Sequence, residues 1–143
     1  MVQRQACPFC EINNEKTRII RKNILTTVAL SNPRLMPGHT LVIPNRHLEK
    51  PWELTDNEII AIFNEINFVR YKLLNSIATG CDVRQNYRPF LAQSKLKVNH
   101  VHFHVLPRTD EDGLYKKSMK FEKSIFKDLT SKERETILKL FHS

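Results

Sequence analysis

The sequence is poor in cysteine, has no long hydrophobic run and carries fewer acidic than basic residues. Its three cysteines, Cys7, Cys10 and Cys81, are an odd and small number for 143 residues, which argues against a disulfide-stapled scaffold. No apolar stretch approaches the roughly 20 residues of a membrane-spanning helix. Residues 1–7 also lack the apolar segment of a secretory signal. These absences predict a cytoplasmic protein with no membrane partner.

Composition and length indicate an ordinary globular protein. Hydrophobic residues make up 41% and charged residues 27% of the chain. We expect a single domain over residues 1–143, with a basic C-terminal extension from about residue 109. Lys and Arg total 23 against 15 for Asp and Glu, a net charge of +8. Such an excess favours anionic partners, but it does not distinguish nucleotides from nucleic acid.

The first half of the chain predicts β-structure followed by one long helix. Residues 17–22 and 25–30 form an expected hairpin, and residues 40–44 a third, buried strand. Thr55 and Glu58 form a capping box that starts the helix, which runs toward Gly80. Apolar residues recur at helical spacing and are expected to lie in the core: Ile59, Ile62, Phe63, Ile66, Val69, Leu73 and Ile77.

The second half predicts two more strands and a short terminal helix. Residues 82–91 are expected to form a strand, residues 93–99 a lysine-bearing loop and residues 100–107 a further strand. Beyond Pro107 the chain becomes polar and basic, and Thr130 with Glu133 caps a final helix. The expected fold class is α+β.

Histidine is concentrated in the strand expected at residues 100–107. His100, His102 and His104 alternate with Val101, Phe103 and Val105, so a strand would place the three imidazoles on one face. The apolar face would anchor the strand in the core, which leaves the imidazoles to line a groove or contact a metal. A solvated face is the structural alternative. Cys7 and Cys10, which are separated by two residues, indicate a metal half-site or a redox pair.

These motifs resemble the histidine triad (HIT) superfamily, in the branch with a Cys-x-x-Cys pair. The resemblance is carried by the segments Pro37-Gly-His-Thr-Leu-Val-Ile-Pro-Asn-Arg-His47 and His100-Val-His-Phe-His-Val-Leu106, and it extends from Cys7 to Arg108. It implies an antiparallel sheet that carries one long helix. It also implies a homodimer, paired through that helix and a strand, and a nucleotide hydrolase or transferase.

The resemblance implies nucleophilic catalysis at phosphorus. His102 would attack the α-phosphorus of a nucleotide to form a nucleotidyl-histidine intermediate, which releases a nucleoside monophosphate. The attacking nitrogen must be neutral, so the other ring nitrogen must donate to a fixed acceptor, such as a strand carbonyl. His104 could then donate to phosphate oxygens, and His39 would line the same pocket. A histidine that only bonds a backbone carbonyl is the alternative for His39.

The resemblance also implies a structural zinc ion held by Cys7, Cys10, His47 and His100. Two thiolates and two imidazoles suit tetrahedral zinc, and four protein ligands close the site. Such a site can contribute substantially to folding. The alternative is a pair of reduced thiols beside a surface His47.

At some of the substrate-binding positions that the resemblance implies, this sequence has residue types that differ from those of relatives. Ser31 and Asn32 stand where relatives carry an acidic residue or asparagine that contacts ribose. Lys97 stands where relatives carry a small hydroxyl residue, so it would place positive charge near the phosphates or the leaving group. Phosphate contacts are expected from Gln85, Asn86 and Arg88; Asn86 could equally serve a plain turn.

Phe9 and Ile12 occupy positions that would form the apolar slot for a purine base, or else pack in the core beside the metal. Two classes of function follow. The first is a phosphoramidase or dinucleoside polyphosphate hydrolase. The second is nucleic-acid end processing of the aprataxin kind, suggested by the net charge but not by any aromatic-interleaved basic groove. A non-catalytic nucleotide-binding protein is a third reading.

Overall fold

The computed structural model describes residues 6–14 and 18–142. The chain divides into two compact units, Met1–Thr109 and Asp110–Ser143. This division falls where the basic extension was expected to begin. Each unit is described by itself below, and the expectation of one domain over the whole chain stays a prediction.

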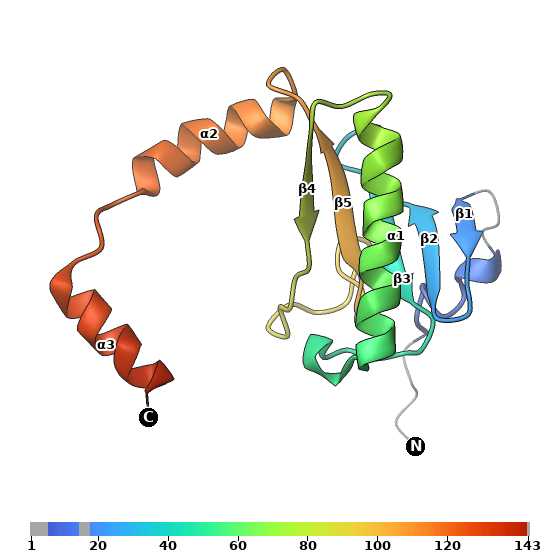
Figure 1. The fold of residues 1–143 in the computed structure, drawn as a ribbon, viewed down its shortest axis with the longest axis horizontal. Helices are drawn as coiled ribbons and strands as arrows, with labels where there is room; N and C mark the ends of the chain where they lie inside the picture. Colours follow the sequence, from blue (N-terminus) through green and yellow to red (C-terminus); the bar gives the residue numbers. More distant parts are fainter. Residues whose placement is uncertain (1–5, 15–17, 143) are drawn as a thin grey trace. The chain divides into compact units, whose positions relative to one another are not determined.

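The first unit is built on a five-stranded antiparallel sheet, in the order β1-β2-β3-β5-β4 (Figure 1). Its strands are β1 (Ile19–Lys22), β2 (Thr26–Leu30), β3 (Thr40–Pro44), β4 (Gly80–Arg84) and β5 (Phe103–Arg108). The expected hairpin is confirmed by the pairing of β1 with β2, although Thr17 lies outside the described residues. The third expected strand is confirmed with the bounds Thr40–Pro44.

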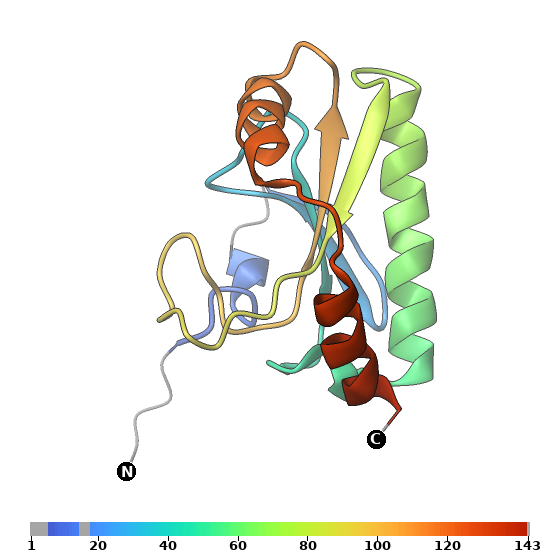
Figure 2. The ribbon, with the colours of Figure 1, turned by 90° about the vertical axis from the view of Figure 1, so that its left-hand side faces the viewer.

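Helix α1 (Asp56–Leu74) covers one face of this sheet (Figures 1 and 2). Its start is the expected capping box, in which the Thr55 hydroxyl accepts from the Glu58 amide and the Glu58 carboxylate accepts from the Thr55 amide. Ile62 and Ile66 are fully buried against the strand residues Val28 and Val105. Each such side chain stabilises the fold by about 2 kcal/mol.

The helix is shorter, and its buried stripe narrower, than the sequence indicated. Ile59 and Phe63 are 42% and 47% exposed, because a helix that lies on one sheet buries only the side chains that face it. Ile77 lies beyond the end of α1, which stops at Leu74 with Asn75 as its C-cap. The expectation that all seven apolar positions are core was therefore wrong for these three.

The opposite face of the sheet carries a second apolar cluster and the histidines. Ile12, in the short 3-10 helix η1 (Ile12–Asn14), packs with Ala29, Leu41 and Ile43. His104 lies opposite Leu41 in the β3–β5 register, so both side chains are on this face. Figure 2 shows η1 and α1 on opposite sides of the sheet.

Two strands are shorter than expected. β4 ends at Arg84, which pairs with His104 at the end of the β4–β5 ladder. Residues 85–91, expected to continue the strand, form a loop. β5 begins only at Phe103, so His100 and His102 precede it. The chain leaves the ladder there because the Val101 amide bonds the Leu48 carbonyl instead.

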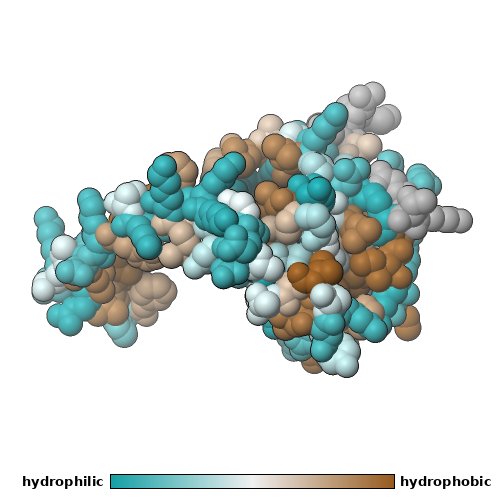
Figure 3. Space-filling view, turned by 90° about the horizontal axis from the view of Figure 1, so that it is seen from above, coloured by the Kyte–Doolittle hydropathy of each residue, from teal (hydrophilic) through white to brown (hydrophobic). Residues whose placement is uncertain are grey.

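The second unit consists of two helices, α2 (Gly113–Ile125) and α3 (Ser131–Phe141). The expected terminal helix is confirmed as α3, with the Thr130–Glu133 capping box in place. Helix α2 was not expected; the Asp112 carboxylate caps it by accepting from the Tyr115 amide. Neither helix contains a buried residue, and Figure 3 shows hydrophobic side chains at the surface. Among the described residues, no helix has the length and apolarity needed to cross a membrane.

Candidate functional site

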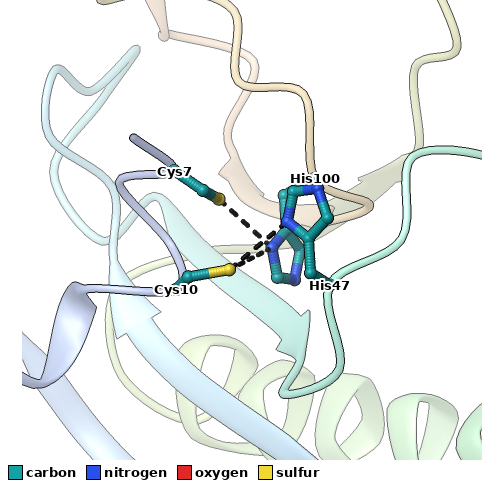
Figure 4. A group of neighbouring side chains, drawn as sticks. All are labelled: Cys7, Cys10, His47 and His100. Atoms are coloured by element: carbon teal, nitrogen blue, oxygen red, sulfur yellow. Dashed lines mark hydrogen bonds between the residues drawn. The ribbon is translucent and has the colours of Figure 1, made fainter. Parts of the chain in front are cut away.

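Four side chains from three parts of the first unit meet in a candidate metal centre (Figure 4). Cys7 and Cys10 come from the segment before η1, His47 follows β3, and His100 precedes β5. The four potential ligand atoms all lie within 4.8 Å of one another. The Cys10 Sγ lies 3.3 Å from the His47 Nδ1, and the Cys7 Sγ lies 3.4 Å from the His100 Nδ1. The residues expected to bind zinc are thus brought together.

The protonation of His100 suits a metal ligand. Its Nε2 lies 2.8 Å from the Pro44 carbonyl oxygen, which only accepts, so the proton is on Nε2. The lone pair of Nδ1 then faces the two sulfurs. Burial, with a smaller effect of neighbouring imidazoles, lowers the pKa of His100 to about 4, so its ring is neutral at pH 7. Two soft thiolates and two neutral imidazoles fit a tetrahedral zinc ion.

His102 is fixed in a single tautomer by the backbone just before it. Its Nδ1 lies 2.7 Å from the His100 carbonyl oxygen, so Nδ1 carries the proton and Nε2 keeps its lone pair. Burial lowers the pKa of His102, and the bond to the carbonyl opposes that effect. A neutral imidazole with an unprotonated Nε2 is the form that can attack phosphorus.

A chain of two hydrogen bonds fixes the tautomer of His104. The Leu35 amide donates to the His39 Nδ1 at 3.1 Å, so a neutral His39 carries its proton on Nε2. That nitrogen lies 2.9 Å from the His104 Nδ1 and donates to it. His104 therefore holds its own proton on Nε2, where it can donate to an anion.

Both imidazoles of this pair are neutral at pH 7. Burial first, then the charge of Arg84, lowers the pKa of His39 to about 4. Burial first, then neighbouring imidazoles and arginines, lowers the pKa of His104 to about 3. The ring centroids of His102 and His104 are 4.8 Å apart, so the two imidazoles are neighbours in the site. The alternative for His39, a bond to a backbone carbonyl alone, does not match these contacts.

The residues expected to contact base and ribose lie in different surroundings. Phe9 is near the histidines, with its ring centroid 5.0 Å from that of His102. Ile12 is 3% exposed in the core cluster, which matches the structural alternative. The Ser31 hydroxyl donates to the Pro33 carbonyl and its amide to the His39 carbonyl, while Asn32 is exposed.

The residues expected to contact phosphate line a single cavity of about 560 Å³. They are Gln85, Asn86, Arg88 and Lys97, together with the metal-site residue His100. The Lys97 ammonium donates to the Leu91 carbonyl and to the Asn99 side chain, so it also ties its own loop together. The Gln85 amide donates to the Asn86 carbonyl.

Arg84 is a site residue that the sequence did not indicate. It pairs with His104 across β4 and β5, and its charge helps lower the pKa of both His39 and His104. No spacing within the chain relates residue 84 to residue 104, because the contact depends on strand register. The Leu35 amide and the Pro44 carbonyl are backbone groups, so no residue type could have identified them.

The profile of the HIT domain family matches residues 12–111. The chain belongs to this family. An uncharacterised HIT-like protein of Methanocaldococcus jannaschii is 32% identical over 110 residues, which are 75% of this chain and 82% of the relative. Adenosine 5'-monophosphoramidase of Schizosaccharomyces pombe is 27% identical over 75% of this HIT protein and 77% of the enzyme. Bis(5'-nucleosyl)-tetraphosphatase (asymmetrical) of the same yeast is 24% identical over 67% of this chain and 52% of the enzyme.

Solved structures confirm the fold. A HIT family protein of Bacillus anthracis has a TM-score of 0.69 at 23% identity, covering 96% of each chain. A zinc-bound histidine triad family protein of Mycobacterium smegmatis has a TM-score of 0.64 at 24% identity, covering 76% of this chain and 79% of the other. The α+β fold expected of a HIT protein is therefore correct, and the named relatives support nucleotide hydrolase activity in general.

Proposed function

We propose that this HIT protein cleaves a purine nucleotide at its α-phosphorus through a covalent nucleotidyl-histidine intermediate and releases a nucleoside monophosphate. The observation that carries the proposal is the bond between the His102 Nδ1 and the His100 carbonyl. This bond leaves Nε2 as the only free nitrogen of a neutral ring. Phosphoramidates and dinucleoside polyphosphates, the substrates in the names of two yeast relatives, are the two substrate classes to test.

The reaction has two displacements. The Nε2 of His102 forms a bond to the α-phosphorus, and the bond from phosphorus to the leaving group breaks, with its electron pair leaving on that group. Water then attacks phosphorus, the P–Nε2 bond breaks, and the nucleoside monophosphate departs with the oxygen from water while one proton goes to solvent. Through both steps Nδ1 keeps its proton on the His100 carbonyl.

His104 and His39 support this chemistry without forming bonds to phosphorus. His104 donates its Nε2–H to a phosphate oxygen, or to the leaving atom as it gains charge. His39 is a positioning residue, since it selects the His104 tautomer through the bond between the His39 Nε2 and the His104 Nδ1. Phe9 lies beside His102 and suits contact with the base, while Ser31 and Asn32 remain proposed ribose contacts.

Cys7, Cys10, His47 and His100 would hold a zinc ion, which would supply cohesion between the N-terminal segment and the segment that carries His100 and His102. Thiolate ligands must stay reduced, so we place the protein in the cytoplasm. Elemental analysis of protein purified without chelator tests the site. About one zinc per chain is expected, and a protein that is folded but contains no metal refutes the assignment.

The first experiment is a substrate panel with His102→Ala. The panel holds adenosine and guanosine phosphoramidates, diadenosine polyphosphates and adenylated DNA, and the product measured is the nucleoside monophosphate. His142→Ala, which removes the exposed histidine at the C-cap of α3, is the matched control. We expect release by the wild type and by the control and none by His102→Ala. Full activity of His102→Ala on every substrate turned over would show that the nucleophile is wrong.

The intermediate itself can be detected by mass. Rapid mixing with substrate followed by an alkaline quench, which preserves an N–P bond, should add one nucleotidyl group to the wild type. The peptide that contains residues 100–108 should carry it. Turnover by an enzyme that shows no such adduct in the pre-steady state would favour direct attack by water.

A homodimer paired through α1 is the proposed assembly. Ile59 and Phe63 are 42% and 47% exposed on this helix, an apolar surface of the kind that interfaces bury. Light scattering of the wild type should give twice the chain mass, and Phe63→Asp should shift it toward the monomer. A monomeric wild type at micromolar concentration refutes the dimer.

The salt dependence of DNA binding distinguishes nucleic-acid end processing from these activities. The net charge of +8 favours contact with phosphates, so an end-processing enzyme would bind DNA with an affinity that falls steeply with salt. We expect no such binding near physiological salt. If the wild type turns over nothing on the panel yet binds nucleotides, the non-catalytic reading replaces the enzymatic one.

A further inference from the structure

Two aromatic side chains of the first unit, one in a 3-10 helix and one in the loop after β4, form an exposed pair. Trp52, in the 3-10 helix η2 (Pro51–Glu53), and Tyr87 meet at a ring-centroid distance of 4.9 Å and an interplanar angle of 81°. They remain 65% and 43% exposed although a core lies nearby. Large aromatic rings on a surface are typical of binding sites, since they offer a flat apolar face at low entropic cost.

Tyr87 also lines the cavity of about 560 Å³, whose charge is predominantly positive. Lys50, Arg88 and Lys97 line it, against Glu49 as its one carboxylate residue. Within residues 6–14 and 18–142, no carboxylate forms an ion pair with any of the three cations. The two partners of Lys97 are neutral oxygens, so its charge stays available to an anion.

The cavity reaches the segment that leads into the proposed nucleophile. His100 and Val101, the two residues that directly precede His102, are part of its lining. Arg88 lies close enough to His104 for its charge to lower the pKa of that imidazole. The cationic cavity thus lies along the His100–Val101 backbone that leads into His102, and the Trp52–Tyr87 pair borders it through Tyr87.

We propose that this cavity is the leaving-group site and that it selects a phosphate chain ending in a planar base. Lys50, Arg88 and Lys97 bind the phosphates, and the rings of Trp52 and Tyr87 receive the base by stacking. This inference rests on the proposed function and sharpens it, because it favours a substrate with a second nucleoside over one whose leaving group is a small amine. Base stacking of this kind does not need sequence-specific hydrogen bonds.

Trp52→Ala tests the proposal through a ratio of two rates. The two substrates share the adenylyl group and differ only in the leaving group: adenosine phosphoramidate and diadenosine tetraphosphate. We expect the ratio of kcat/KM for the tetraphosphate to that for the phosphoramidate to fall about tenfold, the order expected for one lost stack. Trp52→Phe should restore most of it. Phe90→Ala, which removes an 80% exposed ring from the loop that carries Tyr87, should not change it.

Binding can be measured apart from catalysis because Trp52 is the only tryptophan of the chain. In His102→Ala, titration with ATP as a stand-in for the leaving group should quench the tryptophan emission. Arg88→Ala should raise the apparent Kd about tenfold, and inorganic tripolyphosphate should bind with little quenching. This readout stands even if neither substrate is turned over, so failure of the proposed function is distinguishable. An unchanged rate ratio in Trp52→Ala, or emission that ATP does not affect, overturns the inference.

Discussion

The neutrality of His39 predicts that the protein loses stability in mild acid. Its side chain is 4% exposed, and its pKa falls from 6.5 to about 4 in the folded state, chiefly because of burial. Between these two values the unfolded chain binds a proton at this position and the folded chain does not. Stability is therefore complete above pH 6.5 and falls as the pH is lowered toward 4.

The size of the loss follows from the same two values. At pH 5, which is 1.5 below the ordinary pKa of 6.5, the unfolded state gains about 2 kcal/mol from protonation of His39. At pH 7.5 the corresponding gain is about 0.1 kcal/mol. Burial also lowers the pKa of His100, so the total loss of the wild type exceeds the part due to His39.

A variant isolates that part. His39→Gln removes the titrating group while an amide can still bond His104. Urea unfolding of both proteins at pH 7.5 and pH 5 should show that the wild type loses about 2 kcal/mol more than the variant between the two pH values. Because His100 is the same in both proteins, its contribution cancels. An equal loss in both would refute the assignment of a neutral His39.

Further predictions concern the metal site, the helix cap and the core. Cys10→Ser should lower the zinc content by more than half in elemental analysis and lower the melting temperature, whereas Cys81→Ser, outside the cluster, should leave the zinc content unchanged. Thr55→Ala should lower the free energy of urea unfolding by about 1 kcal/mol, because it removes the hydroxyl that accepts from the Glu58 amide at the start of α1. Ile66→Ala, at a site with no exposed surface, should lower it by about 3 kcal/mol through the cavity it leaves.

The sequence predicted features that depend on local pattern. The capping boxes at Thr55 and Thr130 are confirmed because each depends on two residues three positions apart. Helix α2 was missed because its Asp112 cap lacks the reciprocal acidic partner and Gly113 is a weak helix former at its start. Ile59, Phe63 and Ile77 were wrongly predicted to lie in the core. Helical spacing shows that apolar residues share one face of a helix, but it does not show how much of that face the sheet covers.

In the candidate site, too, the residue identities could be predicted from the sequence, whereas the contacts that depend on the folded backbone could not. The identity of the four metal-site residues could be predicted, since each is a residue type with ligand chemistry at a family position, and the structure brings them together. The tautomers could not be predicted, because they depend on the Pro44, His100 and Leu35 backbone groups. Arg84 acts on His39 and His104 only through the β4–β5 register, which is a property of the folded sheet.

His100 connects the candidate metal centre to His102, the proposed nucleophile. Its ring donates through Nε2 to the Pro44 carbonyl and turns Nδ1 toward the two cysteines, while its own carbonyl accepts the proton of His102. The ring and the carbonyl belong to one residue, so contacts that hold the ring also hold the acceptor that defines the His102 tautomer. A rotation of the His100 peptide would free the His102 Nδ1 and allow the proton to move to Nε2, which removes the attacking lone pair. The cluster of Cys7, Cys10 and His47 therefore supports the proposed nucleophile through the backbone, at a distance from phosphorus.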